Sequence, residues 1–149
     1  MELLRLAALD AEDLTVISAH LQDAILRPED LTYLAGEQRF LMVARRFDWT
    51  PDVPPRRRLA GLHIERVLAV KTRGLSQDDA MPMSLLALTF TPTDTPSGLI
   101  DLVFSGGAAV RLEVECIEVR MKDLGPVWEA ATRPGHDVDR PDVAPGTAA

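Results

Sequence analysis

The chain of 149 residues has few of the residues on which metal and thiol chemistry depend. Cys116 is its single cysteine, so neither an intramolecular disulfide nor a cysteine-based zinc site can form. The three histidines, His20, His63 and His136, fall on an expected helix, an expected strand and the C-terminal segment. Only His63 and Glu65 make a local pair of ligand types, and two ligands on one strand are common by chance. We therefore expect no metal and no cofactor.

The chain also lacks the usual motifs of catalysis and nucleotide binding. It has no G-x-S-x-G elbow and no G-x-G-x-x-G fingerprint. Ser105-Gly106-Gly107 lacks the Gly-Lys-Ser/Thr ending of a P-loop and leads into a strand, which favours a hairpin turn. Cys116 falls on an apolar strand face, where we expect a buried and unreactive thiol. These absences favour a protein that is not an enzyme, although a site assembled from scattered residues stays open.

Long apolar runs are absent as well. No segment approaches the roughly 20 apolar residues that a membrane helix needs. Glu2, Asp10, Glu12 and Asp13 make the N-terminal region acidic, and no small-residue cleavage site follows, which argues against a secretory signal. We expect a cytoplasmic protein with no membrane association.

Lysine is scarce, with 2 residues against 14 arginines, and the charge is unevenly distributed. Residues 1–38 carry a net charge of −6, residues 39–73 carry +6 and residues 74–149 carry −7, which add to the total of −7. A basic segment thus lies between two acidic ones. Neutralisation of that segment by its acidic neighbours is the simplest explanation.

The stretch RRFDWTPDVPPRRR, residues 45–58, is the strongest functional lead in the sequence. Arginines interleaved with aromatics can hold phosphates and stack bases, but a pI of about 4.9 is far below that of a dedicated nucleic-acid binder. Three interpretations remain: a loop whose arginines pair with acids or face water, a protein-contact surface, and a site for an anionic ligand or nucleic acid. Nucleic acid is the disfavoured partner. The candidate binding residues are Arg45, Arg46, Trp49, Arg56, Arg57 and Arg58.

Hydrophobic spacing predicts one helix and several strands. Apolar residues at spacings of three and four predict a helix over about residues 11–25, with Asp10 as its N-cap. Period-two alternation predicts strands over residues 31–34, 39–47, 59–73, 84–91, 99–104 and 109–121, with residues 2–9 as a further strand or an extended arm. Residues 48–60 are expected to form a long loop, and residues 127–131 a helical turn that packs Trp128 on the core.

The last strand contains a change of phase. The apolar positions are even-numbered up to Cys116 and odd-numbered from Ile117. A regular strand would turn its second half toward solvent, so we expect a bulge, a sharp bend or a change of sheet partner at this point.

Together these patterns predict an α+β fold in a single domain over residues 1–132. The N-terminal helix packs on a strongly bent antiparallel sheet of six to seven strands, and closure of the sheet into a barrel is one form that this order of elements allows. Residues 133–149 are rich in proline and aspartate and are expected to form a disordered tail.

Four segments, LRLAALDAEDLTVISAHLQDA, QRFLMVARRFDW, RVLAVKTRG and VRLEVECIEVRMKDLGPVW, resemble a bacterial family catalogued as domain of unknown function 2948. The resemblance covers about residues 3–130. It implies a small single-domain bacterial protein and carries over no catalytic residue, ligand or partner. The function we expect is therefore that of a non-enzymatic binding or adaptor domain.

Overall fold

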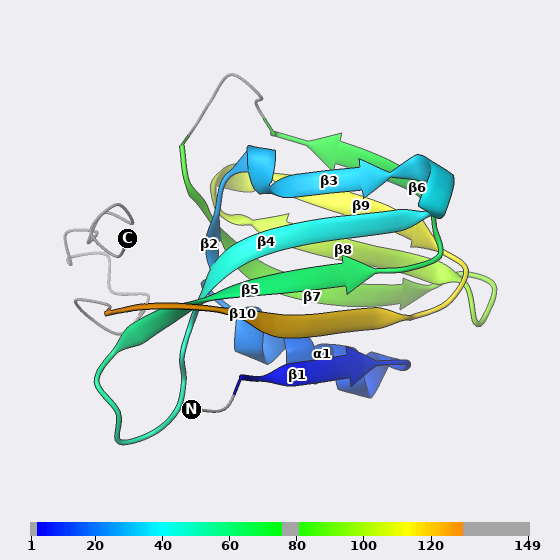
Figure 1. Cartoon of the computed structure of the whole chain (residues 1–149). Helices are drawn as coiled ribbons and strands as arrows, with labels where there is room; N and C mark the ends of the chain where they lie inside the picture. Colours follow the sequence, from blue (N-terminus) through cyan, green and yellow to red (C-terminus); the bar gives the residue numbers. More distant parts are fainter. Residues whose placement is uncertain (1–2, 76–80, 130–149) are drawn as a thin grey trace.

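The computed structural model of the chain describes residues 3–75 and 81–129 (Figure 1). Within them lie one α-helix and ten strands, joined by three short 3₁₀ turns. In chain order the helix and strands are β1 (Arg5–Ala8), α1 (Ala11–Leu21), β2 (Ile25–Leu26), β3 (Leu31–Leu34), β4 (Arg39–Phe47), β5 (Arg56–Ile64), β6 (Val67–Arg73), β7 (Met83–Pro92), β8 (Gly98–Phe104), β9 (Ala109–Val114) and β10 (Val119–Glu129).

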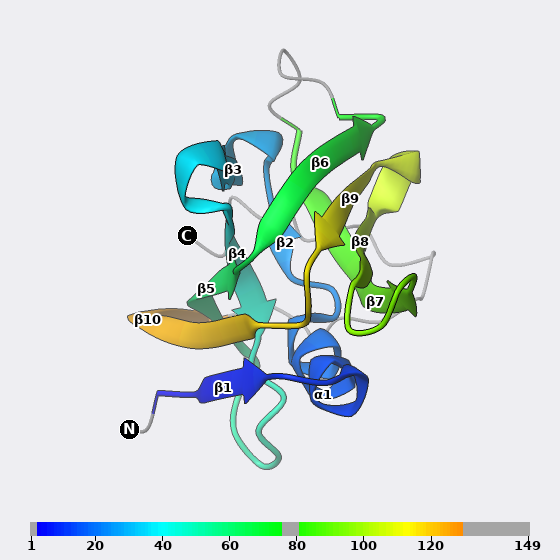
Figure 2. The same cartoon turned by 90° about the vertical axis from the view of Figure 1, so that its right-hand side faces the viewer.

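The ten strands form one antiparallel sheet in the order β1-β10-β5-β4-β2-β7-β8-β9-β6, with β3 paired to β4 off this path. The sheet is strongly curved, so that β10, β5 and β4 lie on one side of the molecule and β7, β8 and β9 on the other (Figure 2). Helix α1 packs against β7, β1 and β4 at one end. The apolar core fills the space that the two halves of the sheet and the helix enclose.

The α+β class, the single helix and the antiparallel sheet are confirmed, but the expected count of six to seven strands is wrong. The sheet is also not closed into a barrel, because no ladder joins β3 or β1 to β6 among the described residues. Tyr33 of β3 reaches the start of β6, where its hydroxyl donates to the carbonyl of Val67 at 2.8 Å. Some of the additional strands arise because two long segments of alternating hydrophobicity, each predicted as one strand, divide into two strands.

The first run, residues 59–73, divides at Arg66. Arg66 has a φ of +56°, in the left-handed region, and a continuous strand cannot contain a residue in this conformation. β5 therefore ends at Ile64 and pairs with β4 and β10, whereas β6 starts at Val67 and pairs with β9.

The second run divides where the change of phase predicted it. β9 ends at Val114 and pairs with β6 and β8, whereas β10 starts at Val119 and pairs with β5 and β1, so the change of sheet partner is confirmed. In the intervening bend Ile117 is buried, and Cys116 is only half-buried. The expectation of a buried Cys116 inside a strand is thus wrong, because the core side chain at this bend is the next residue.

Helix α1 begins as the sequence predicts. The carboxylate of Asp10 accepts a hydrogen bond from the backbone N–H of Asp13 at 2.8 Å, which is the expected N-cap. The helix ends at Leu21 rather than near residue 25, because Asp23 adopts a φ of +65° and turns the chain into the short strand β2.

Two further expectations need correction, and both concern the ends of strands. β5 begins at Arg56, so the three consecutive arginines belong to a strand and not to the expected 48–60 loop. Val127–Glu129 continues β10 opposite Arg56–Arg58 instead of forming a helical turn, because a register shift after Asp123 lets pairing resume. The expected tail over residues 133–149 lies outside the described residues. In the part that is described, no helix has the length and apolar character to cross a membrane.

Candidate functional site

The arginines of residues 45–58 gather on two paired strands. In the ladder between β4 and β5, Arg46 lies opposite Arg58 and Phe47 lies opposite Arg57. The backbone N–H of Asp48 donates to the carbonyl of Arg56 at 2.9 Å, which extends the pairing by one residue. The fold therefore brings the candidate residues together, and strand alternation then divides them between the two faces of the sheet.

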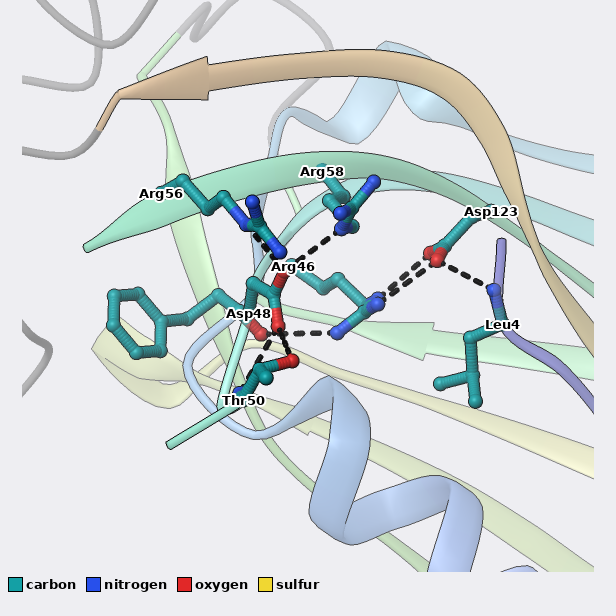
Figure 3. Close-up of polar contacts among 8 residues, drawn as sticks. Leu4, Arg46, Asp48, Thr50, Arg56, Arg58 and Asp123 are labelled. Atoms are coloured by element: carbon teal, nitrogen blue, oxygen red, sulfur yellow. Dashed lines mark hydrogen bonds and ion pairs between the residues drawn. The ribbon is translucent and has the colours of Figure 1, made fainter. Parts of the chain in front are cut away.

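On one face Asp48 holds two of the arginines (Figure 3). Its Oδ2 accepts hydrogen bonds from Arg56 Nε at 2.6 Å and from Arg58 Nε at 2.8 Å. Its Oδ1 accepts from the backbone N–H and the hydroxyl of Thr50. Burial alone would raise the pKa of Asp48, but the hydrogen bonds from Thr50, Arg58 and Arg56 outweigh burial and hold this pKa far below its usual range.

On the same face Asp123 of β10 holds Arg46. The pair is bidentate, with Arg46 Nε 2.7 Å from Oδ1 and Arg46 Nη2 2.9 Å from Oδ2 of Asp123. The carboxylate also accepts from the backbone N–H of Leu4 at 2.9 Å, so it ties the segment before β1 to the same network (Figure 3). Burial opposes ionisation of Asp123, but the bonds from Arg46 and Leu4 prevail and lower its pKa.

The remaining candidate residues contact aromatic rings and carbonyl groups. Arg57 Nη1 donates to the carbonyls of Asp23 and Arg45 at 3.2 and 3.0 Å, and its guanidinium lies 5.9 Å from the ring centroid of Phe47. The guanidinium of Arg45 lies 5.4 Å from the ring centroid of Trp128. Trp49 packs edge-on against Phe47 with 37% of its surface exposed. Most of the guanidinium groups in this segment therefore face protein groups.

His20, at the end of α1, lies close to this network. Burial and the positive charge of Arg46 lower its pKa, and the charges of Asp123 and Asp48 oppose this shift only in part. The imidazole is consequently neutral at pH 7. Both carboxylates near it accept from arginine, so neither resembles a free general base.

A second group of cations lies on the solvent-facing surface of the same sheet. We call this surface the outer face and define it as the solvent side of β1, β10, β5 and β4. Across these strands Arg5 lies opposite Lys122, and Arg120 lies opposite His63. They border a hollow of about 430 Å³ lined by Arg5, Leu6, Ala7, His63, Arg120, Met121 and Lys122. None of the arginines of residues 45–58 lines this hollow.

The middle of the outer face is apolar. Leu41 and Val43 point outward from β4, since the alternate residues Phe40 and Met42 are buried. Leu124 of β10 covers Gly61 of β5, whose missing side chain leaves room for it. An apolar strip thus lies beside the cationic hollow.

Sequence reasoning missed the outer face because its residues come from distant segments. Arg120 and Lys122 alternate with buried residues and look like an ordinary solvated strand edge. Their neighbours Arg5 and His63 lie far from them in sequence. Only the strand order brings the four together.

Ligands for a metal ion do not converge anywhere in residues 3–75 and 81–129, where no group of three or more His, Cys, Asp or Glu side chains has a suitable arrangement. His63 and Glu65 remain a pair, with Nδ1 and Oε2 4.0 Å apart, and Glu65 is also bound by Arg39.

Fold and site together define a small α+β domain with a curved antiparallel sheet, a buried arginine–aspartate network and a cationic hollow. The chain belongs to the family described as "Protein of unknown function (DUF2948)", whose model matches residues 4–136. No curated protein and no solved structure matches the chain.

Proposed function

We propose that the protein is a non-enzymatic binding domain that recognises an acidic protein partner through its outer face. The observation that carries this proposal is the composition of that face, an apolar centre beside Arg120 and Lys122, which no salt bridge engages among the described residues. Val43 and Leu124 expose 37% and 39% of their surface, and Arg120 and Lys122 stand next to them. Exposed apolar groups with a charged rim are typical of protein interfaces, where the charges select the partner.

The edge of the sheet at β6 is a less suitable place for a partner. Among the described residues β6 ends the strand order with one side unpaired, but it carries Lys71 and Arg73 and a register irregularity after Val67. Charged side chains and bulges are the features that protect edge strands from pairing with other chains. Recognition by a sheet face therefore fits this molecule better than addition of a strand.

Binding through the arginines of residues 45–58 has weaker support. Asp48 and Asp123 already engage Arg46, Arg56 and Arg58. An approaching anion would have to displace these short ion pairs. The segment instead stiffens the sheet that carries the outer face.

Site-specific photocrosslinking tests the proposal. p-Benzoylphenylalanine is placed at position 43 on the outer face, and in a matched control at position 103, where Val103 of β8 has a similar exposure of 36%. In cells that express the protein, we expect a discrete crosslinked species from position 43 and none from position 103. Addition of Arg120→Glu and Lys122→Glu should abolish the crosslink at position 43. Equal crosslinking at the two positions, or indifference to the charge reversal, would contradict the proposal.

A further inference from the structure

We propose that the hollow on the outer face is a binding site for a small organic molecule that carries a phosphate monoester. This ligand site goes beyond the proposed function, because it requires no protein partner. The volume of about 430 Å³ lies in the range of small-molecule sites. Three strands, β1, β10 and β5, supply the lining, so the positions of its side chains are set by the sheet and not by a loop.

The cations around the hollow lie opposite one another across the strands. Arg5 opposite Lys122, and Arg120 opposite His63, are cross-strand neighbours that cost stability when both carry positive charge. Within residues 3–75 and 81–129, no salt bridge engages Arg5, Arg120 or Lys122. Binding of an anion between these side chains would turn mutual repulsion into attraction.

The nearest acid does not neutralise the group. Glu65 Oε2 is 4.0 Å from Nδ1 of His63, but Arg39 Nε binds both oxygens of this carboxylate at 3.0 Å. Glu118, which directly precedes β10, is bound by Arg66 at 3.2 Å. Both of these acids are thus already engaged by an arginine.

The chemistry of the lining favours a phosphate on an organic body. A phosphate monoester carries about −1.5 to −2 charges at pH 7 and offers three acceptor oxygens. Arginine forks match such oxygens in geometry, and Arg5, Arg120 and Lys122 approach from two neighbouring strands. Of the apolar lining residues, Ala7 is exposed and can contact the remainder of the ligand, whereas Met121 is buried and Leu6 packs against the core.

Size and long-range field both favour a small ligand over a polymer. The chain has a net charge of −7, so a long polyanion meets repulsion from most of the surface. A single phosphate group interacts mainly with the local cations, since charges beyond a Debye length of about 8 Å are screened at physiological salt.

Isothermal titration with ribose 5-phosphate, and with ribose as its uncharged counterpart, tests the site. We expect ribose 5-phosphate to bind with a Kd below about 1 mM, and ribose not to bind. Arg120→Gln with Lys122→Gln should weaken binding at least tenfold. Lys71→Gln with Arg73→Gln removes two exposed cations from β6 and should leave the Kd unchanged.

Three results would overturn the inference. The first is equal binding by wild type and the Arg120→Gln, Lys122→Gln variant, or no binding at all. The second is binding of citrate without binding of ribose 5-phosphate, which would assign the site to carboxylates. The third is tighter binding of a ten-nucleotide oligomer than of ribose 5-phosphate. Val43→Asp separates the two proposals, since it should abolish the partner crosslink detected from a probe at position 124 and leave the Kd for ribose 5-phosphate within about threefold.

Discussion

Two ion pairs of nearly identical geometry show how much burial matters at the level of single residues. Arg46 binds Asp123 at 2.7 and 2.9 Å, and Arg111 binds Asp101 at 2.8 and 3.0 Å, both through two hydrogen bonds. The side chains of the first pair are 5% and 1% exposed, whereas those of the second are 54% and 19% exposed. The two pairs therefore form an internal comparison in which distance is constant and solvation changes.

We predict that Asp123→Asn destabilises the protein by about 3–5 kcal/mol, because it leaves the guanidinium of Arg46 buried without a counter-charge. The amide also loses one acceptor for Arg46 or for the N–H of Leu4. The matched change Asp101→Asn should alter stability little, since an exposed pair is screened by solvent. Urea unfolding of the three proteins measures the difference, and similar losses in both variants would contradict this account.

Protonation of the network gives a pH dependence with a defined sign. Asp48 and Asp123 have pKa values below those of the unfolded chain, so their contribution is complete above about pH 4 and is lost as the pH falls through the folded values. We predict a steep loss of stability below about pH 4. Asp123→Asn should make that loss shallower, and an unchanged slope in chemical denaturation at pH 2–4 would contradict the assignment.

His20 adds a second, smaller loss of stability, which occurs at higher pH than the loss caused by the aspartates. Its folded pKa is lowered, so the unfolded chain binds the proton more tightly and stability falls as the pH drops below about 6.5. We predict that His20→Gln removes the change in melting temperature between pH 7 and pH 5 and leaves the phase below pH 4. A change between pH 7 and pH 5 that persists in His20→Gln would show that another group causes it.

At the level of strands, like charges face each other across β1 and β10. Removal of one of these charges is therefore predicted to increase the stability of the protein. Lys122→Gln should raise stability by roughly 0.2–1 kcal/mol, or about 1–4 °C in melting temperature, because it removes repulsion from Arg5. Lys71→Gln is the control. Lys71 also faces an arginine, Arg111, but Asp101 neutralises that residue, so no gain is expected. Differential scanning calorimetry of both variants in low salt measures the change in melting temperature. A lower melting temperature for Lys122→Gln than for the wild type would contradict the predicted repulsion between Arg5 and Lys122.

Local elements could be predicted from the sequence because their causes are local. The Asp10 cap and the change of phase near residue 116 each depend on a few neighbouring residues, and both predictions hold. The boundaries at Asp23 and Arg66 were missed, since both residues adopt positive φ without being glycine. Nothing in the local pattern signals such a turn, which tertiary contacts impose.

The candidate site was predictable only in part, for the same reason. The sequence shows that residues 45–58 are exceptionally rich in arginine. These arginines are close together in the chain, so their proximity in the β4–β5 ladder could be expected. Burial of Arg46 did not follow, because the carboxylate that compensates it, Asp123, lies 77 residues away. The outer face was out of reach, as it exists only when β1, β10 and β5 are adjacent.

At the scale of the whole molecule, the basic segment of residues 39–73 forms ion pairs with acids from other parts of the chain. Its strands β4 and β5 lie between β10 and β2 in the strand order. Acids from the C-terminal part reach into it, as Asp123 binds Arg46 and Glu118 binds Arg66. The alternation of charge along the chain thus becomes a set of contacts that hold distant segments together. Among the described residues, the outer-face cations Arg5, Arg120 and Lys122 take part in none of these salt bridges.

This distribution leads to a prediction for nucleic acid. We expect no binding to generic DNA or RNA tighter than about 10 µM at physiological salt, far weaker than specific recognition. Arg46 and Arg58 are buried and paired, and the net charge of −7 opposes a long polyanion. A salt titration with a fluorescent oligonucleotide of about 20 nucleotides measures this directly.

Variants for this titration need care, because Arg57 and Arg58 are buried and their loss would destabilise the sheet. Arg56→Gln is the suitable change in the arginine segment, as this side chain is 24% exposed. Arg120→Gln with Lys122→Gln is its counterpart on the outer face. Sub-micromolar binding that Arg56→Gln weakens would make the 45–58 segment a nucleic-acid surface. Sub-micromolar binding lost only in the second variant would instead place nucleic acid on the outer face, in the hollow that we assign to a small phosphate ester.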